Sequence, residues 1–374
     1  MKLVLSVEAL SPDLTGIGRY TWELAQRLPH SPQLGSVRFY RNGRWVTDLQ
    51  SLLQTAAPPP LQPAKGNRLR LKLPRAVRDW GIRLGCRGSV FHGPNFFLPA
   101  WAETGVVTVH DLSVFKFPET HPLQRIKQFE REFKASMARA AHLITDSKAT
   151  RLEVIDFLGW PAEKITAVPL GASPRFAPAS AVALAPVLNR YGLTYGNYAL
   201  CVSTLEPRKK VANLLRAYQC LPTQLREQYP LVVVGGRGWL SDALHEEIRR
   251  LSATGWLKYL GFVPDADMLA LYAGARSFVY PSIYEGFGLP VLEAMSSGIP
   301  VVTSCFTSLP EITQNAALLL NPNDIDALSA GIQTSLIDEV WRANAATAGI
   351  AVARTYSWDA CIEQTVAVYQ KIGN

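Results

Sequence analysis

The chain has 374 residues, 48% of them hydrophobic and 18% charged, a balance that excludes a disordered protein and favours two folded domains. The formal net charge of +8 favours acidic partners such as nucleotides, nucleic acid or an anionic membrane surface. The five cysteines show no C-x-x-C spacing, which argues against a disulfide framework or a zinc site and indicates a reducing compartment.

The N-terminal sequence MKLVLSVEALSPDLTG starts with a short apolar run that no small-residue cleavage site follows. We interpret this run as a first strand rather than a signal peptide. No apolar run in the chain approaches the ~20 residues that a membrane-spanning helix needs. We therefore expect a cytoplasmic protein.

Two halves of the chain alternate apolar strands with amphipathic helices, the pattern of a parallel α/β sheet. The first half predicts strands at 2–7, 89–93, 105–112 and 141–147, and helices at 19–28, 76–84 and 123–141. The second half predicts strands at 198–204, 230–236, 257–263, 277–282 and 299–304, and helices at 211–221, 242–251, 265–273, 290–297 and 324–334.

The segment between the two halves is rich in Pro, Ala and Ser and has little periodicity, which favours an interdomain linker. The sequence thus predicts two Rossmann-like, doubly wound α/β domains, at 1–172 and 191–356, joined by a linker at 173–190. An amphipathic helix follows at 357–372, and its docking partner is left open, the N-terminal domain being one candidate.

The stretch YPSIYEGFGLPVLEAMSSGIPVVTS predicts a strand, a glycine loop, a short helix and a second strand. Ligands of open α/β sheets bind at such strand ends, and a helix N-terminus favours phosphate. Gly286 and Gly288 permit close backbone approach to a ligand. Glu293, about one turn into the helix, is placed to accept hydrogen bonds from ribose hydroxyls, and Glu285 lies nearer a sugar attached to the diphosphate. The structural alternative is that Glu285 caps backbone N–H groups and Glu293 is a solvated helix residue.

These two glutamates, separated by seven residues, resemble the motif of retaining glycosyltransferases with the GT-B fold, in particular glycosyltransferase family 4, also called group 1. The likeness runs nearly end to end and is weakest between 33 and 87. The forms LEPRK and GGRGW are similar to the mannosyltransferase-like branch that builds bacterial surface polysaccharides. Other matching segments, in chain order, are GIGRY, VHDLS, TDSKATRLEVIDFLG, KITAVPLGA, STLEPRKK, VVVGGRGW, LGFVPDADMLALYAGA, SLPEI and YSWDACIEQTVAVY.

Arg208 and Lys209 follow a predicted strand end, where two cations would neutralise the charge that grows on a leaving diphosphate. The alternative is a solvated basic turn. Two features depart from the family pattern: Ser203 replaces its usual glycine, and Lys210 stands where asparagine is common. We interpret Lys210 as surface charge.

The resemblance implies that the two domains face each other across a cleft, and it implies further roles for residues around that cleft. Gly16 and Gly18 would let a loop close over the diphosphate or the acceptor, whereas without the resemblance so short a glycine pattern indicates a plain tight turn. His110 would lie near the donor sugar, bonding a hydroxyl or shaping the acceptor side, unless it is structural with Asp111 as its partner or as a helix cap. His92 is a weaker candidate for the acceptor side.

The remaining predicted donor contacts come from backbone groups and loop residues. Val263, with Gly261 and Phe262, would read the nucleobase edge, and Phe287 and Leu289 complete the glycine loop. Asp265 and Asp267 mimic a D-x-D metal motif, but we interpret them as an N-cap and a first-turn acid. The two cations and the helix N-terminus supply the charge, so we predict no metal and no separate cofactor.

Residues 65–88 are rich in Lys and Arg, with Asp79 as the single acid and Trp80 interleaved. A solvated basic helix and peripheral docking on the inner face of an anionic membrane both fit this composition.

The sequence therefore predicts a metal-independent, retaining hexosyltransferase with a nucleotide-sugar donor, GDP-mannose first and a UDP-sugar second, and a saccharide or lipid-linked acceptor. The rivals are a nucleotide-sugar-binding protein without transfer activity, which the retained glutamates and cations disfavour, and a nucleic-acid-binding protein. The latter is suggested by charge alone and has no recognised module, so we expect no nucleic-acid partner.

Overall fold

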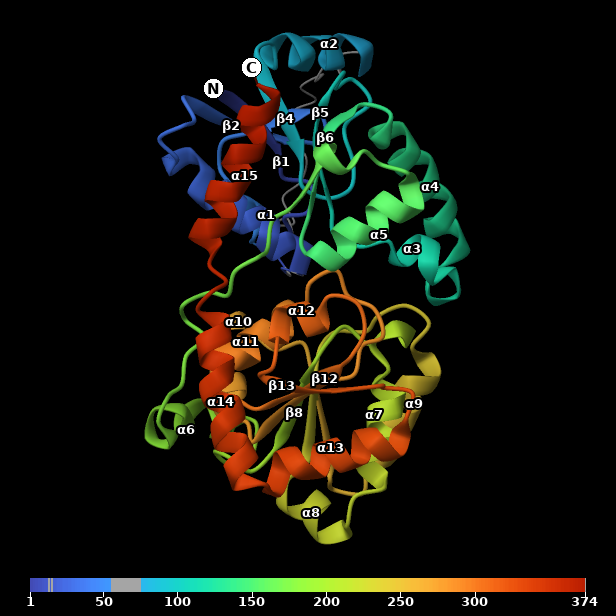
Figure 1. Cartoon of the computed structure of the whole chain (residues 1–374), viewed down its shortest axis with the longest axis vertical. Helices are drawn as coiled ribbons and strands as arrows, with labels where there is room; N and C mark the ends of the chain where they lie inside the picture. Colours follow the sequence, from blue (N-terminus) through green and yellow to red (C-terminus); the bar gives the residue numbers. More distant parts are fainter. Residues whose placement is uncertain (13, 15, 55–74, 374) are drawn as a thin grey trace, which may run out of the picture.

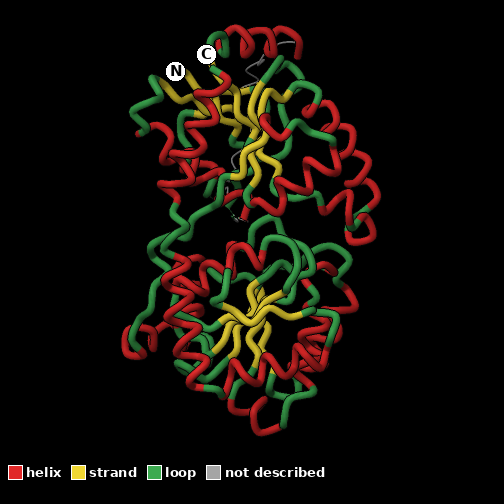
Figure 2. The backbone as a smooth tube through the Cα atoms, viewed as in Figure 1, coloured by secondary structure: helices red, strands yellow, loops and turns green. Residues whose placement is uncertain are grey.

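The structure is a computed structural model that describes residues 1–12, 14, 16–54 and 75–373, and it has two lobes. Each lobe has a twisted sheet at its centre and helices around it, as Figures 1 and 2 show. The chain passes from the upper to the lower lobe after β7 and returns after α14, so that both termini lie in the upper lobe (Figure 1).

The N-terminal lobe is built on a sheet in the order β3-β2-β1-β4-β5-β6-β7, parallel throughout except for the β2–β3 pair. Its strands are β1 (Lys2–Ser6), β2 (Ser36–Arg41), β3 (Arg44–Val46), β4 (Ser89–Gly93), β5 (Gly105–Val109), β6 (Ala140–Thr145) and β7 (Ile165–Ala167). Its helices are α1 (Gly16–Arg27), α2 (Arg75–Gly85), α3 (Ser113–Lys116), α4 (Leu123–Met137), α5 (Lys148–Leu158) and the C-terminal α15 (Trp358–Ile372).

The C-terminal lobe has a fully parallel sheet in the order β10-β9-β8-β11-β12-β13. Its strands are β8 (Ala199–Val202), β9 (Leu231–Val234), β10 (Leu257–Gly261), β11 (Ser277–Tyr280), β12 (Val301–Ser304) and β13 (Ala317–Leu320). Its helices are α6 (Ala181–Arg190), α7 (Val211–Gln219), α8 (Thr223–Gln228), α9 (Asp242–Ser252), α10 (Asp265–Ala273), α11 (Leu289–Ser296), α12 (Leu309–Thr313), α13 (Ile325–Ile337) and α14 (Glu339–Ala353). Short 3₁₀ turns occur at Leu28–His30, Gln50–Leu52, Pro118–Thr120, Ala162–Lys164 and Pro207–Lys209.

The central strands form because they are apolar runs that both helical layers bury, as expected for parallel sheets. Every residue of β5, β9, β11 and β12 is buried. All the predicted strands are present, but β2, β3, β7 and β13 were missing from the sequence prediction. The predicted helix at 123–141 ends at Met137, and Ala140 already belongs to β6.

The segment 173–190, which we predict as a linker, contains α6, a helix that Ser180 caps and that packs against α10. The C-terminal helix α15 packs on α1 and β6 of the first lobe. Its Tyr369 hydroxyl lies 2.7 Å from Nδ1 of His92. The last helix thus returns to the N-terminal lobe and ties the two ends of the chain together.

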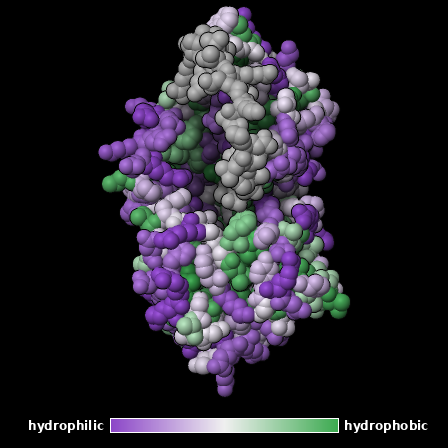
Figure 3. All heavy atoms as spheres, turned by 180° about the vertical axis from the view of Figure 1, so that it is seen from behind, coloured by the Kyte–Doolittle hydropathy of each residue, from purple (hydrophilic) through white to green (hydrophobic). Residues whose placement is uncertain are grey.

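Among the residues that the structure describes, no helix is both long enough and apolar enough to cross a membrane. On the face seen in Figure 3, hydrophilic side chains predominate at the flanks of both lobes, and hydrophobic ones show in separate patches. The exposed large apolar residues include Trp80, Leu123 and Phe262.

Candidate active site

The glycine loop between β11 and α11 forms the centre of the candidate site, in the predicted order of strand, loop, helix and strand. Gly288 is the N-cap of α11 and has φ 114°, a conformation that only glycine adopts without strain. Pro290 lies in the first turn, where its missing N–H costs nothing. Gly298, with φ 74°, follows the helix end. Local residue chemistry therefore fixes the shape of this loop.

The carboxylate of Glu285 is 9% exposed and is held by side chains from two other segments. Its Oε1 accepts hydrogen bonds from Lys209 Nζ at 2.5 Å and from the Tyr280 hydroxyl at 2.8 Å. Arg208 Nη1 lies 3.6 Å from Oε2. Burial would raise the pKa of Glu285, but Lys209 and Arg208 outweigh it and lower that pKa to about 2. Glu285 is thus a buried anion, not the backbone cap of the structural alternative.

Arg208 and Lys209 lie in the 3₁₀ turn that follows β8, at the carboxyl edge of the sheet. Arg208 donates to the Tyr284 carbonyl at 2.7 Å, and its Nε lies 2.7 Å from Oε1 of Glu206. Burial and the neighbouring Arg208 lower the pKa of Lys209. Two cations therefore face two carboxylates, and an arriving diphosphate would have to draw the cations away from Glu285 and Glu206. This arrangement rules out the simple solvated basic turn.

Glu293 lies on α11 and is 8% exposed, which also rules out a solvated helix residue. Arg19 of α1 faces the C-terminal lobe: its Nε lies 3.9 Å from Oε1 of Glu293, and its Nη2 donates to Asp265 at 3.0 Å. Burial raises the pKa of Glu293 to about 7, although Arg19 and Tyr272 oppose the shift. The two glutamates of the motif thus have opposite titration behaviour because only Glu285 has two close cations.

Replacing Glu293 by glutamine is expected to stabilise the protein at high pH. The raised pKa means that Glu293 binds its proton more tightly in the folded state than in the unfolded state. The contribution of this proton to the stability of the fold is therefore complete below pH 4.5, the pKa in the unfolded state, and is lost as the pH rises through about 7. Glu293→Gln should raise the free energy of unfolding by about 3 kcal/mol at pH 8 and change it little at pH 4, measured by urea unfolding. Glu363→Gln, at an exposed position of α15, is the matched control and should change stability at neither pH. Equal stability of Glu293→Gln and the native protein at pH 8 would contradict this prediction.

His110 is 6% exposed, and both of its ring nitrogens are used within the protein. Nε2 donates to the Pro94 carbonyl at 2.8 Å, and Nδ1 lies 2.6 Å from Oδ2 of Asp146. Asp146, not Asp111, is therefore its partner, while Asp111 accepts from the backbone N–H of Ser113. With these bonds in place no ring nitrogen is free for a sugar hydroxyl, so the predicted hydrogen bond is not available here. The expectation that His110 shapes the acceptor side stays a prediction.

Two of the predicted glycines, Gly16 and Gly286, lie where one lobe contacts the other. Gly16 and Gly18 belong to the first turn of α1 rather than to a loop. A Cβ on Gly16 would lie 4.0 Å from Leu289, and one on Gly286 would lie 1.7 Å from the backbone carbonyl oxygen of His110. The N-terminal lobe therefore contacts the glycine loop directly.

The other predicted donor residues take different positions. Phe287 is buried and packs edge-on against Tyr356, and Val263 is a core residue that is 4% exposed. Its neighbour Phe262 is 62% exposed instead. The side chain of Val263 thus lies in the core, and the base reading that we predict for its backbone groups stays a prediction.

Asp265 and Asp267 have separate partners, as local helix-start residues. Pro264 is the N-cap of α10, so Asp265 is a first-turn acid and not the cap that we predict. Asp267 accepts from Arg190 at 2.6 Å and from the Tyr191 hydroxyl at 2.7 Å. Each of the two carboxylates thus forms an ion pair with a different arginine, Asp265 with Arg19 and Asp267 with Arg190.

Several residues around the site were not predicted. Glu206 is 2% exposed beside Arg208, and Asp146 bonds His110. The Tyr284 hydroxyl crosses the lobes: it accepts from the Leu112 N–H at 3.0 Å and donates to Glu153 at 2.6 Å. Their position in the sequence, directly after β6 or beside the glycine loop, could have indicated that Asp146 and Tyr284 belong to the site. His92, by contrast, is fully buried between Tyr369 and Thr108 and is structural.

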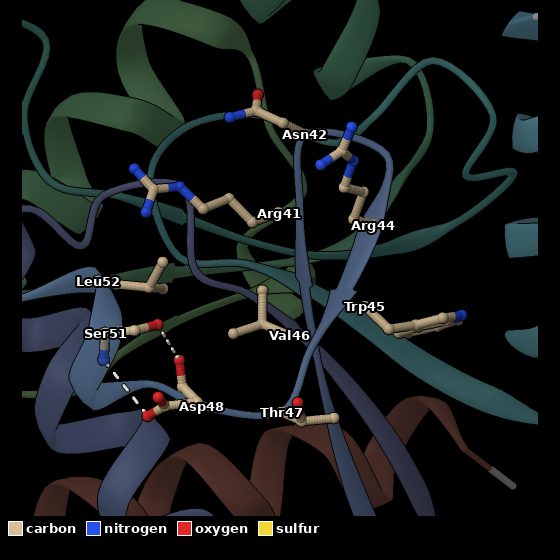
Figure 4. Close-up of a pocket in the computed structure, with 9 residues that line it drawn as sticks. All are labelled: Arg41, Asn42, Arg44, Trp45, Val46, Thr47, Asp48, Ser51 and Leu52. Carbon is tan, nitrogen blue, oxygen red and sulfur yellow. Dashed lines mark hydrogen bonds between the residues drawn. The ribbon is translucent and has the colours of Figure 1, made fainter. Parts of the chain in front are cut away.

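A separate hollow lies at the β2–β3 hairpin and contains none of the predicted site residues. Figure 4 shows Arg41 and Arg44 at its rim, with Asp48 bonded to Ser51 at its base. Residues 65–74 of the basic stretch 65–88 lie outside the described residues, which resume at 75. Within it, Trp80 of α2 is 63% exposed.

Comparison with known proteins agrees with this two-lobed site. Residues 14–176 match the model of Glycosyltransferase Family 4, and residues 193–351 match that of Glycosyl transferases group 1. The chain is 40% identical to the O-antigen chain mannosyltransferase B of Escherichia coli, over 99% of this chain and 100% of that protein. It is 29% identical to the serotype-specific mannosyltransferase WbdA of Escherichia coli, over 62% of this chain and 29% of that protein.

The fold has solved counterparts. The structure of HepE from Anabaena in complex with UDP and glucose has a TM-score of 0.75 and 20% identity, covering 99% of both chains. This likeness shows the fold, and the sequence matches show the family. The chain belongs to the group 1 glycosyltransferases, within glycosyltransferase family 4, and has their GT-B fold.

Proposed function

We propose that this protein is a retaining, metal-independent mannosyltransferase that moves mannose from GDP-mannose to a saccharide or lipid-linked acceptor during the assembly of a bacterial surface polysaccharide. The observation that carries the choice of sugar is the end-to-end identity of 40% with an O-antigen chain mannosyltransferase. The candidate site supports the chemistry, because buried cations and carboxylates from separate segments meet at the carboxyl edge of the sheet, the edge at which open α/β sheets bind ligands.

In the proposed reaction the bond from the sugar C1 to the β-phosphate oxygen breaks while a bond to the acceptor oxygen forms on the same face. The proton of the acceptor hydroxyl passes to the leaving phosphate. Arg208 and Lys209 would turn from Glu285 and Glu206 to the phosphate and stabilise its growing charge. Glu285 would then accept hydrogen bonds from the sugar hydroxyls, and Glu293 from the ribose.

Metal independence is expected to appear as activity that survives a chelator. The nearest candidate for a D-x-D site is divided between two partners, since Asp265 pairs with Arg19 and Asp267 with Arg190. Transfer of mannose should therefore keep at least half of its rate in excess EDTA. A loss above tenfold that Mg²⁺ or Mn²⁺ restores would overturn this part of the proposal.

The donor and the stereochemistry are tested together. Purified protein is incubated with octyl α-D-mannopyranoside and either GDP-mannose or UDP-glucose, and the product of each reaction is examined by NMR. We expect an α-linked mannoside, the same anomeric configuration as in the donor. Consumption of UDP-glucose alone would contradict the donor assignment but keep the enzyme class, and a β-linked product would contradict retention.

The membrane part of the proposal concerns residues 65–88. A lipid-linked acceptor would bring the enzyme to the inner face of the plasma membrane, and the exposed Trp80 beside basic residues supports docking there. Co-sedimentation with vesicles containing phosphatidylglycerol, compared with purely zwitterionic vesicles, measures it. Equal binding to both vesicle types would overturn it.

A further inference from the structure

His121 lies at the junction of the two lobes. It follows the 3₁₀ turn Pro118–Thr120 and precedes α4, and its ring centroid is 5.5 Å from that of Trp239 in the opposite lobe. The Trp239 indole donates to the Thr120 carbonyl at 2.5 Å, and the Arg125 guanidinium lies 4.6 Å from the Trp239 ring. Contacts between the lobes therefore surround this histidine.

His121 is 5% exposed, yet neither of its ring nitrogens has a hydrogen-bond partner among the described residues. The other buried histidines differ. His92 and His110 have partners at both nitrogens, and His142 bonds Thr166 at 2.8 Å. Leaving a buried polar group unpaired destabilises the fold, so such a group calls for a partner that binds later.

The surroundings of His121 keep its imidazole neutral and connect it with the candidate active site. Burial lowers its pKa, and the charges of Arg125 and Arg208 lower it further, while Asp111 opposes them. Phe117, four residues before His121, packs against Tyr284, the neighbour of Glu285, with the two ring centroids 5.0 Å apart, so this segment lies beside the candidate active site. A neutral imidazole offers one donor and one acceptor, the pair that a sugar hydroxyl satisfies.

We propose that His121 is an acceptor-binding residue, whose unpaired ring nitrogens hydrogen bond to a hydroxyl of the saccharide acceptor when the lobes hold both substrates. This inference rests on the proposed function and assigns it a residue on the acceptor side. The N-terminal lobe carries His121, whereas Glu285, Glu293, Arg208 and Lys209 belong to the other lobe. Trp239 and Arg125 would support the ring from the side.

The test is His121→Phe, which keeps an aromatic ring against Trp239 and removes both unpaired nitrogens. We expect an unchanged or higher melting temperature, GDP binding within twofold of the native protein, and at least a tenfold lower kcat/KM for octyl α-D-mannopyranoside, mainly through KM. His142→Phe, the same substitution at a buried histidine with a partner, is the matched control and should lower the melting temperature.

Each outcome is decisive. A native kcat/KM in His121→Phe overturns the inference, and so does a fall in melting temperature like that of His142→Phe, because the nitrogens would then serve the fold, for example through an ordered water. His121→Gln, which restores a donor and an acceptor, should recover part of the acceptor affinity. If the native protein transfers mannose and His121→Phe does so equally well, only this inference fails. If the native protein transfers none, the proposed function fails, and the two melting temperatures still decide whether the nitrogens are unpaired.

Discussion

Replacing Lys209 by alanine is expected to lower kcat for sugar transfer by about 10²–10³-fold, the usual cost of removing one group that stabilises developing negative charge. Lys209 is 8% exposed and donates to Glu285 at 2.5 Å, so no solvent cation can take its place. Steady-state kinetics with GDP-mannose at saturating acceptor measure the change.

The same substitution should destabilise the protein, by a different route. The depressed pKa of Glu285, about 2 against 4.5 for the free group, contributes stability that is present above pH 4.5 and lost as the pH falls toward 2. Without Lys209 that pKa rises toward its ordinary value. Arg208 keeps part of the effect, so Lys209→Ala should lower the unfolding free energy at pH 7 by only part of that contribution, and by less as the pH falls toward 2, as measured by urea unfolding at each pH.

Lys210→Ala is the matched control, since Lys210 adjoins Lys209 but has no assigned contact with the site. It should keep kcat within twofold and stability within about 0.5 kcal/mol of the native values. If Lys209→Ala retains native kcat, or if Lys210→Ala loses as much, the cation that we assign to the diphosphate is the wrong one.

The central strands of both sheets were predictable because they are continuous apolar runs, buried on both faces, that alternate with amphipathic helices. The strands β2, β3, β7 and β13 were not, because few of their residues are buried. In β2 only Tyr40 is fully buried, and the pattern of apolar residues is weak. The Asn42–Gly43 pair, with φ 48° and 74°, was the unused signal for the hairpin to β3. Helix α6 was not predicted because it contains Pro186, and a proline inside a segment rich in Pro, Ala and Ser favours a linker over a helix.

For the site, the local sequence predicted the glycine loop, but it could not predict which cations pair with which carboxylates. Lys209 and Glu285 are 76 residues apart in the chain, and only the sheet order, with β11 beside β8, brings them together. The sequence therefore suggested free cations for a phosphate, whereas the structure holds them in ion pairs with Glu285 and Glu206. The pairing of His110 with Asp146 has the same origin, since β5 and β6 are neighbours.

Replacing Gly286 by alanine is expected to prevent the two lobes from meeting. A Cβ at this position would lie 1.7 Å from the His110 carbonyl oxygen and 2.7 Å from its carbonyl carbon, both backbone atoms that cannot turn aside. The lobes would have to separate, and the bonds beside the clash would break with them: the Thr150 hydroxyl donates to the Gly286 carbonyl at 3.1 Å, and Tyr284 bonds Leu112. Because transfer needs groups from both lobes, kcat/KM should fall by at least about 10²-fold, the loss that a misplacement of about 1 Å can cause.

Small-angle scattering separates this cause from unfolding. Gly286→Ala should show a larger radius of gyration with an unchanged circular dichroism spectrum, since each lobe has a hydrophobic cluster of its own besides the cluster that both lobes share. Gly81→Ala is the matched control: nothing lies within 4 Å of its added Cβ on α2, so activity and shape should stay native and the helix should gain about 1 kcal/mol. Native activity together with native compactness in Gly286→Ala would contradict this prediction, because the lobes would then accommodate the added Cβ without separating and without a loss of transfer.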